Sequence, residues 1–517
     1  MKKSILVGID LGSSNVKTVL FDCELREIAS AKEEYNTIIP KPGWSEYDPS
    51  EWWKGVIKTF KVALEKSGIE PRNIVGIGVS SLGCCPVPMD KTGNTVYNGI
   101  PWSDHRAQHE VDYLKKYCAE LIYKKCKNVP TTLNSAPHLM WIKNNEKEVY
   151  KKIFKYTEPS GFIVQKFTGD FTMDYSFASS EDFGFDINIL NWSEELINAM
   201  GLDINIFPKL HHNMDCIGEL SEKSSKELNI LPGIKIFAGG IDITASTVGV
   251  GVINSGQGHY SMGSGANMMV MTDNQEISSP NLLSIFHAKG PELRMLDGVQ
   301  GSIGYSVRWF RDNFSGLENI SSKLLSNSVN SFELMDLEAS KTKPGAGGII
   351  YIPYLFGKFH PVLNPNARGI FFGLNSLTTR SQIFRAMLEG CSFDMYQNLN
   401  SCKKLGLKVK EIIVSGGPAI SSPWCQIMAD VSNTKIITVK VSEASPLGNA
   451  IIAGIGCGLF KDLDEVRNKF IIEDKIYEPN HKNHELYHEL FGIYEQIYQK
   501  LLTTFDSLEV ISKKFSL

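Results

Sequence analysis

Residues 5–22 read ILVGIDLGSSNVKTVLFD, and this stretch decides the fold class. Two apolar, β-branched runs flank the small residues Gly12, Ser13 and Ser14, which predicts a hairpin with a glycine-containing turn. Backbone amides of such a turn can approach a phosphate, and the carboxylate of Asp10 beside it could bind Mg²⁺. Taken alone, the pattern favours an ordinary tight turn with surface Asp and Ser.

A second hairpin of the same plan is predicted at residues 258–271, GHYSMGSGANMMVM, around the turn Gly263-Ser264-Gly265. The stretch 248–258, VGVGVINSGQG, separates the two hairpins and is rich in small and turn residues. A chain of 517 residues also exceeds what one hydrophobic core usually serves. We therefore expect two domains, residues 1–253 and 254–517.

The remaining predicted elements alternate between strands and helices, which indicates α/β layers. Thr379 and Gln382 have the spacing of a capping box, so a helix should begin there. The other predicted elements are strands at 74–79, 235–238 and 411–415, and helices at 49–66, at 424–431 and from 483 onward.

Composition narrows the class of protein. The 42% hydrophobic and 21% charged residues are ordinary for a globular chain, and a net charge of -4 gives no electrostatic footprint for nucleic acid or an anionic membrane. The apolar N-terminal run stops at Asp10, and no stretch approaches a membrane-spanning length. The ten cysteines lack metal-ligand spacing and are expected to be reduced. We expect a cytoplasmic protein with no nucleic-acid or membrane partner.

Gly416 and Gly417 follow the predicted strand 411–415, where bare backbone can lie against an adenine or ribose. A plain strand-to-helix turn is an equal alternative. The chain has no GxxxxGK[ST] loop and no GxGxxG with a downstream acid, so P-loop and dinucleotide-binding proteins are excluded.

In order along the chain, six motifs resemble those of the FGGY carbohydrate kinases, within the actin and hexokinase superfamily. The likeness extends nearly from the N-terminus through Gly458. The motifs are GIDLGSSNVKTVLFD at 8–22, PGWSEYDPSEWW at 42–53, GGIDITASTVGVGV at 239–252, MGSGANM at 262–268, GIFFGLNSLTTRSQIFRAMLEGCSFDM at 369–395 and VSGGPAISSPWCQIMADVSNTKI at 414–436.

The resemblance implies two RNase H-like α/β domains with a catalytic cleft between them, the sugar mostly on the first and ATP mostly on the second. Asp242 matches the catalytic aspartate that accepts the proton of the attacking hydroxyl; from its local sequence alone it reads as a helix cap. Asp10 is implied near Mg²⁺. The residues implied at phosphate are Gly12, Ser13, Ser14, Gly263 and Ser264, and those at adenosine are Gly416, Gly417 and Asn449.

Two residues near the adenosine depart from the family pattern. Pro418 stands where glycine is common, and Asn449 stands where alanine is common. The geometry around adenine is therefore expected to differ.

On the substrate side, the WSDHR stretch at 102–106 resembles the family's W-x-D-x-R, whose aspartate accepts hydrogen bonds from sugar hydroxyls. This implicates Asp104, although pairing with Arg106 or capping a helix is an equal alternative. Ser81, Cys84 and Trp44 are further candidates, with structural packing the alternative for Trp44.

The segment 80–85, SSLGCC, lacks both the Arg-Glu pair of glycerol kinases and the Gln-Met-His run of xylulokinases. It also holds no cation for an anionic substrate. We expect a neutral ketose or polyol of about five carbons, such as xylulose, as the small-molecule partner. The alternatives are a glycerol- or erythritol-type polyol kinase, a catalytically weak nucleotide-binding regulatory protein and a hydrolase of the same superfamily. The sequence leaves a homodimer open.

Overall fold

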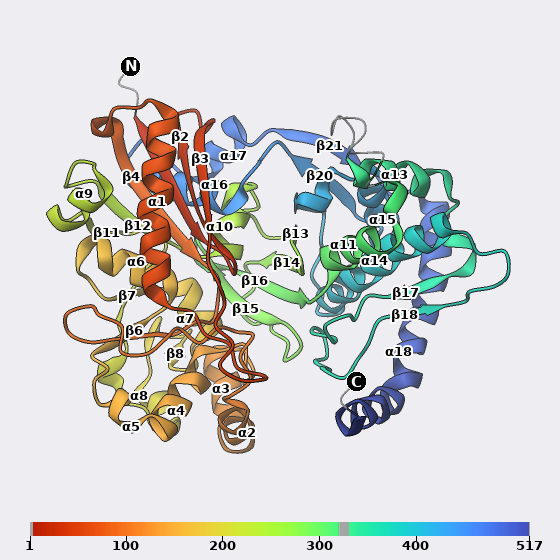
Figure 1. Ribbon diagram of the computed structural model, residues 1–517, viewed down its shortest axis with the longest axis horizontal. Helices are drawn as coiled ribbons and strands as arrows, with labels where there is room; N and C mark the ends of the chain where they lie inside the picture. The colour runs from red at the N-terminus through yellow and green to blue at the C-terminus, as the bar shows by residue number, and fades with distance from the viewer. Residues whose placement is uncertain (1–3, 319, 321–329, 516–517) are drawn as a thin grey trace. The chain divides into compact units, whose positions relative to one another are not determined.

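The computed structural model describes residues 4–318, 320 and 330–515 (Figure 1). The chain forms two compact units, and each is described by itself. Unit 1 comprises Met1–Ile253, Asp273–Met295 and Val441–Ile471, and unit 2 comprises Asn254–Thr272, Leu296–Lys440 and Ile472–Leu517. The first break falls where the glycine-rich stretch suggested. The predicted second domain is not continuous, however, because residues 273–295 and 441–471 belong to unit 1.

Unit 1 is built on a six-stranded sheet in the order β11-β12-β4-β1-β2-β3. The first three strands in sequence form an antiparallel meander, and β4 and β12 extend it in parallel to β1. The sequence therefore predicted the α/β class correctly. The strands are β1 (Ile5–Leu11), β2 (Asn15–Phe21), β3 (Glu27–Glu34), β4 (Ile74–Ser81), β11 (Cys216–Glu219) and β12 (Lys235–Ile241).

Alternate residues of β1 enter two different cores, because successive side chains of a strand point to opposite faces. Val7 and Ile9 pack with α1 (Pro49–Ser67) and α6 (Pro159–Thr168), and Figure 1 shows α1 lying across that face. Leu6 instead packs with residues of α16 (Ala444–Gly456) on the opposite face.

Helix α16 approaches the sheet so closely that glycine is required beneath it. A Cβ on Gly8 would lie 1.9 Å from the carbonyl oxygen of Pro446, and a Cβ on Gly78 would lie 2.3 Å from that of Asn449. The two chain segments are distant in sequence, so this packing explains why 441–471 joins unit 1 despite its late position.

Unit 1 also contains short elements that are not strands of this sheet. They are β5 (Val87–Met89), α2 (Gln108–Tyr117), α3 (Ala119–Cys126), α4 (Ser135–Asn145), α5 (Lys147–Tyr150), β6 (Lys155–Thr157), β7 (Thr172–Asp174), α7 (Tyr175–Glu181), β8 (Phe185–Asp186), β9 (Asn191–Trp192), α8 (Glu194–Ala199), β10 (Lys209–His211), α9 (Glu222–Leu228), α10 (Asp242–Gly249), β15 (Leu283–His287) and α17 (Leu463–Phe470).

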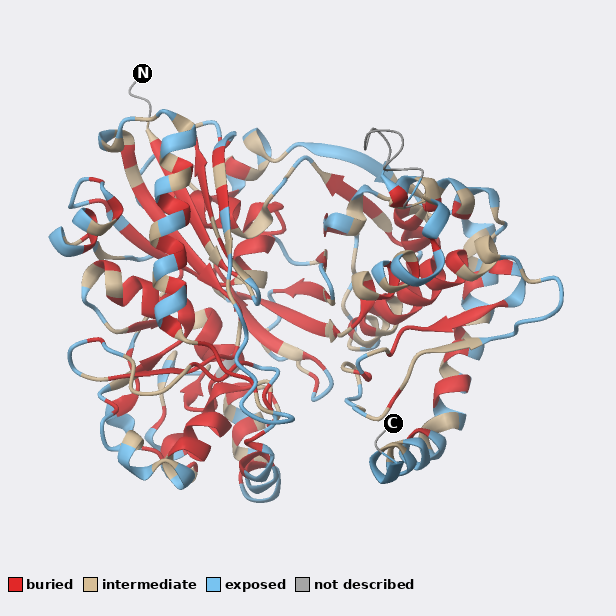
Figure 2. Cartoon of the chain, in the orientation of Figure 1, coloured by how far each residue is buried: buried red, intermediate tan, exposed pale blue. Residues whose placement is uncertain are grey.

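Unit 2 repeats the hairpin plan. Strands β13 (Gln257–Met262) and β14 (Ala266–Thr272) are antiparallel, and β19 (Glu411–Gly416) runs parallel to β13, as β4 runs parallel to β1. Most strand residues of both sheets are buried (Figure 2). The other elements are β16 (Gly290–Gln300, in unit 2 from Leu296), α11 (Ile303–Phe314), α13 (Ser331–Lys341), β17 (Ile350–Ile352), β18 (Ile370–Phe372), α14 (Arg380–Lys404), α15 (Ser422–Ser432), β20 (Lys435–Val439), β21 (Glu473–Tyr477) and α18 (His481–Phe515).

The capping box that the sequence predicted is present at the start of α14. The Thr379 hydroxyl accepts the Gln382 N–H at 3.3 Å, and Gln382 Oε1 accepts the Thr379 N–H at 2.8 Å. All ten cysteines are free thiols, seven of them buried, as expected for reduced cysteines. Within the described ranges, no helix has both the length and the apolar character to cross a bilayer.

Gly416 should be the most sensitive glycine at the end of β19. Its φ of 93° and ψ of 175° lie in a region that only glycine adopts readily, and a Cβ there would lie 1.9 Å from the carbonyl oxygen of Met262. We expect Gly416→Ala to lower the free energy of unfolding by about 2–4 kcal/mol, measured by denaturant titration. The neighbouring Gly417→Ala is the matched control, because a Cβ on Gly417 meets nothing within 4 Å. Equal stability of the two variants would contradict this account.

Candidate active site

The polar residues of unit 1 gather where its parallel strands end. In the register of the sheet, Ser80 on β4 pairs with Asp10 on β1 and with Gly240 on β12, so the three strands finish at one edge. The Ser80 hydroxyl donates to Asp10 Oδ1 at 2.7 Å. Loops at the carboxyl ends of parallel strands are the usual ligand sites of open α/β sheets.

The pKa of the Asp10 carboxyl is shifted from its ordinary value. Burial raises the pKa of its carboxyl to about 6, while the hydrogen bond from Ser80 and the charge of Lys17 oppose the rise. Lys17 pairs with Asp10 across the hairpin and forms an ion pair with Glu443 at 2.5 Å. Burial thus disfavours the ionised form of Asp10, and the charge of Lys17 favours it.

The Gly12–Ser14 turn has its carbonyl oxygens engaged by the protein. The Tyr35 hydroxyl donates to the carbonyl oxygen of Gly12, the Tyr47 hydroxyl donates to that of Ser13 at 2.7 Å, and the Tyr35 N–H donates to that of Ser14 at 3.1 Å. Ser13 and Ser14 are exposed, and no hydrogen bond to another described residue uses their backbone N–H groups. The backbone N–H groups of Ser13 and Ser14 can therefore donate to a ligand, and a phosphate needs donors of this kind.

The turn of unit 2 is similarly fixed. The Tyr305 N–H donates to the carbonyl oxygen of Ser264 at 2.9 Å, and the start of α11 packs so closely that a Cβ on Gly304 would lie 2.0 Å from the carbonyl oxygen of Gly263. Arg308 Nη2 donates to the Ser264 hydroxyl at 2.9 Å. The sequence analysis missed Arg308, since only the fold brings helix α11 beside this turn.

Gly416 and Gly417 lie at the same edge of the unit 2 sheet as the Gly263 turn. Met262, the last residue of β13, is the register partner of Gly416. Gly417 is exposed and faces open space. The structure therefore brings together the residues implied at phosphate and at adenosine in unit 2.

Asn449 lies elsewhere than the resemblance implied. It belongs to α16 of unit 1, is fully buried, and donates from Nδ2 to the carbonyl oxygen of Ile9 and to the Ser80 hydroxyl, each at 2.8 Å. Because its amide serves the interior of unit 1, we remove Asn449 from the adenosine site. Its contacts tie α16 to β1 and β4.

Asp242 is the first residue of α10, directly after β12, at the same sheet edge as Asp10. Its Oδ1 accepts the N–H of Ile243 at 2.7 Å, and the Ser445 hydroxyl donates to its carbonyl oxygen at 3.1 Å. The residue in the cap position is Ile241. Asp242 is thus not the cap residue itself, but its carboxylate accepts a backbone N–H of the first turn of α10. Its catalytic role stays a prediction.

Asp104 forms the ion pair that the sequence left as an alternative. Its side chain is fully buried and accepts from Arg106 Nε at 2.9 Å, from Arg106 Nη2 at 2.8 Å and from the Ser45 N–H at 2.6 Å. Arg106 also contacts Glu46 at 2.8 Å. With both oxygens of Asp104 engaged, the expectation that it accepts sugar hydroxyls is corrected to a structural role.

Trp44 packs against other side chains of the protein, which is the alternative to a substrate contact. Arg106 lies 3.9 Å and Lys41 lies 3.6 Å from its ring centroid, and Trp141 contacts its edge with ring centroids 5.1 Å apart. These contacts occupy the ring within the protein. A sugar-stacking role for Trp44 is therefore not supported by its surroundings.

Ser81 and Cys84 are buried behind the sheet edge. The Ser81 hydroxyl accepts the N–H of Ser160 at 3.0 Å, and Cys84 Sγ lies 3.9 Å from Nδ1 of His138. Cys84 has a φ of 45°, uncommon for a residue with a side chain. Their substrate contacts stay predictions.

An ion-pair role for Asp104 gives a stability prediction. Removing one partner of a buried pair leaves the other charge uncompensated, so Asp104→Ala should lower the free energy of unfolding by about 3 kcal/mol. Asp170→Ala, at an exposed carboxylate of the same unit, is the control. Denaturant titration of both variants decides it. An Asp104→Ala protein as stable as the control would restore Asp104 as a substrate ligand.

The fold suggests a class of enzyme, and comparison with known proteins shows the family. Two α/β units, each with a hairpin turn whose exposed groups could accept phosphate, fit the class of phosphotransferases. The models of the FGGY family of carbohydrate kinases match this chain, the N-terminal domain at residues 5–249 and the C-terminal domain at 258–457. The chain belongs to the FGGY family of carbohydrate kinases, which use ATP as phosphate donor.

Similar proteins of this family have different acceptors. The chain is 29% identical to a xylulose kinase of Staphylococcus xylosus, over 95% of this chain and 99% of that one, and 28% identical to glycerol kinase 2 of Sulfolobus acidocaldarius, over 93% and 94%. Two structures from Lactobacillus acidophilus, a xylulose kinase and a gluconate kinase, each match with a TM-score of 0.88 at 25% identity, over 98% of this chain and 100% of theirs.

Proposed function

We propose that this kinase transfers the γ-phosphoryl group of ATP to a terminal primary hydroxyl of a neutral, open-chain ketopentose such as xylulose. The observation that carries the proposal is the likeness to xylulose kinases over almost the whole chain. The 80–85 segment supports a neutral acceptor because it holds no cation. Arg106 of the WSDHR stretch is committed to Asp104 and Glu46.

In this proposal, Asp242 accepts the proton of the attacking hydroxyl as the oxygen bonds to phosphorus. In unit 1, the amides and hydroxyls of Ser13 and Ser14, together with Gly12, bind phosphate oxygens. In unit 2, Gly263 and Ser264 bind phosphate oxygens, and Gly416 and Gly417 border the adenosine. Binding by fixed backbone donors stabilises the charge of the transferring group.

Asp10 is the residue that we propose for Mg²⁺. The described part of the chain has no group of three or more His, Cys, Asp or Glu side chains that could hold a metal ion. A magnesium ion that travels with a nucleotide needs only one or two carboxylates from the protein, so the carboxylate of Asp10 beside the first phosphate turn fits. When bound, the ion supplies charge neutralisation at the phosphates. A cytoplasmic location and a homodimer remain predictions.

The acceptor is tested by ADP release at saturating Mg-ATP. The panel is D-xylulose, L-xylulose, D-ribulose, L-ribulose, erythritol, ribitol, glycerol and gluconate, with the Asp242→Asn protein as blank. We expect a pentulose to give the highest kcat/KM. A tenfold preference for gluconate, equal to about 1.4 kcal/mol, would contradict the neutral acceptor. Acceptor-independent ADP release would favour a hydrolase, and no turnover with any acceptor would favour a regulatory protein.

A further inference from the structure

The strand that leads to Asp242 is irregular just before it ends. The pairing of β12 with β4 shifts register between Ala238 and Gly240, which places a bulge at Gly239. Gly240 then has a φ of 94°. Bulges beside active sites change the direction in which the following side chain points. The direction of Asp242 therefore depends on what holds this bulge.

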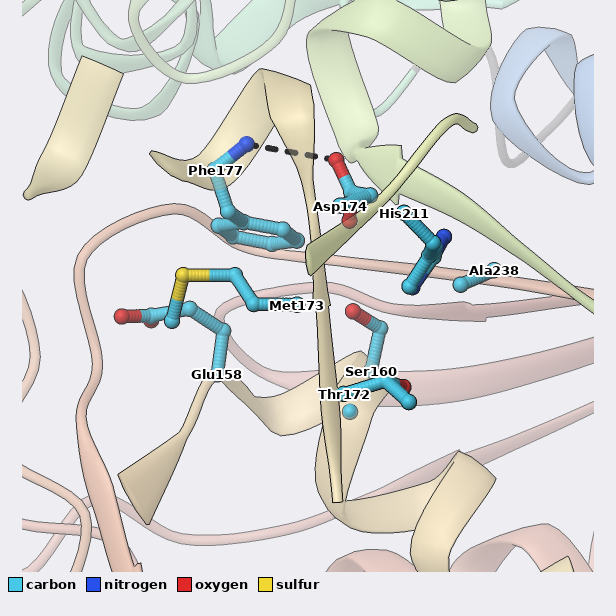
Figure 3. A pocket seen from close by; sticks show the side chains of 9 residues that line it. Glu158, Ser160, Thr172, Met173, Asp174, Phe177, His211 and Ala238 are labelled. Atoms are coloured by element: carbon cyan, nitrogen blue, oxygen red, sulfur yellow. Dashed lines mark hydrogen bonds between the residues drawn. The ribbon is translucent and has the colours of Figure 1, made fainter. Parts of the chain in front are cut away.

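Three buried polar residues hold it. Asp174, Ser176 and Asn213 are 2%, 0% and 1% exposed, and they come from β7, α7 and the loop after β10. Asp174 Oδ1 accepts the N–H groups of Ser176 at 2.9 Å and Phe177 at 3.2 Å, as well as Asn213 Nδ2 at 2.9 Å (Figure 3 shows the bond from Phe177). The Ser176 hydroxyl also donates to Asp174 Oδ1.

The same residues contact the bulge directly. The Ser176 hydroxyl accepts the N–H of Ile241 at 3.2 Å, and Asn213 Nδ2 lies 3.4 Å from the carbonyl oxygen of Gly239. Between these two bonds, a Cβ on Gly240 would lie 2.3 Å from Asn213 Nδ2 and 2.4 Å from Ser176 Oγ. The network thus packs directly against the backbone of Gly240. It forms hydrogen bonds with the residues on either side, Gly239 and Ile241.

The pocket beside Asp174 leaves no room for a ligand. The small pocket that Asp174 lines with His211 and Ala238 is too tight to hold a water molecule (Figure 3). The polar groups form hydrogen bonds with one another and with the backbone of β12. Any effect of these residues on the active site must therefore pass through the end of β12, to which they hydrogen-bond.

We propose that Ser176 and Asn213, oriented by Asp174, are positioning residues that fix the direction of the Asp242 carboxylate through the β12 bulge. The inference rests on the proposed function, in which Asp242 accepts the substrate proton. Without the Ser176 hydroxyl, the Ile241 N–H loses its buried partner, and Asp242 is the next residue. Small misplacement of a catalytic group can lower the rate by about 10²-fold without loss of substrate binding.

The test is a double-mutant cycle on kcat. Ser176→Ala should lower kcat about 10- to 100-fold while the KM values for sugar and ATP change by less than about threefold. In the Asp242→Asn background the same substitution should change kcat by less than about threefold, since no proton acceptor remains to be positioned. Asn213→Ala, measured in the same way, is the second variant. Ser224→Ala is the matched control, because that hydroxyl is also buried in unit 1 but donates to the carbonyl oxygen of Lys166.

The outcomes separate the inference from the proposed function. Equal kcat losses from Ser176→Ala in both backgrounds would show a general structural effect and overturn the inference. Unchanged kcat in both Ser176→Ala and Asn213→Ala proteins would overturn it as well. If Asp242→Asn alone retained near-native kcat, the catalytic assignment itself would fail. Thermal unfolding of each variant shows that the proteins compared are folded.

Discussion

The Asp242→Asn protein should fold normally and bind ATP, yet turn over its sugar about 10² to 10⁴ times more slowly than the native protein. An amide has nearly the shape of a carboxylate but cannot accept the hydroxyl proton. Asp242 is only partly buried at the start of α10, so the substitution leaves no charge stranded in the core. The reduced kcat is read from sugar-dependent ADP release at saturating substrates.

Asp170→Asn makes the same chemical change at an exposed position of unit 1 and serves as the control. Thermal unfolding and ATP titration of both variants should match the native protein. A native kcat in the Asp242→Asn protein would remove this residue from the mechanism.

Gly12→Val and Gly263→Val should each weaken ATP binding at least about tenfold, or 1.4 kcal/mol, with little change in sugar affinity. A Cβ on Gly12 would lie 3.6 Å from its nearest neighbour, the carbonyl oxygen of Asn15, and one on Gly263 would lie 3.9 Å from that of Gly265. The protein itself therefore tolerates the first side-chain atom. Loss of ATP affinity would mean that the branched side chain occupies space needed by phosphate.

Isothermal titration with ATP and, separately, with the sugar measures both affinities. Gly492→Val on α18 is the control, because a Cβ there meets nothing within 4 Å and the position is outside both turns. Unchanged ATP affinity in both turn variants would reject the phosphate role of these turns.

Local patterns predicted most of the fold. The two hairpins, the capping box at Thr379 and the strand 411–415 depend on residues close in sequence, and all of them are present. Segments 273–295 and 441–471 follow the predicted boundary in sequence, yet by their contacts they belong to unit 1, because tertiary packing joins them to it. Gly8 and Pro446 are far apart in the sequence. Their close approach cannot be inferred from the residues around either one.

The candidate site was predictable where a turn itself supplies the groups, as at Gly12 and Gly263. It was not predictable where side chains act through distant partners. The motif around Asp104 does not reveal that Arg106 saturates the carboxylate, and nothing near Asn449 indicates its bonds to Ile9 and Ser80. Ser176 likewise becomes relevant to Asp242 only once α7 packs on β12.

Product analysis tests the central claim most directly. The native protein is incubated with Mg-ATP and D-xylulose, and the phosphorus-containing products are identified by ³¹P NMR and mass spectrometry. The account predicts ADP and a sugar monophosphate in equal amounts, with the phosphate on a primary carbon and no product from the Asp242→Asn protein. The incubation is repeated with L-xylulose, D-ribulose and L-ribulose, and ADP accompanied by inorganic phosphate, with no phosphorylated sugar from any of the four pentuloses, would contradict the account.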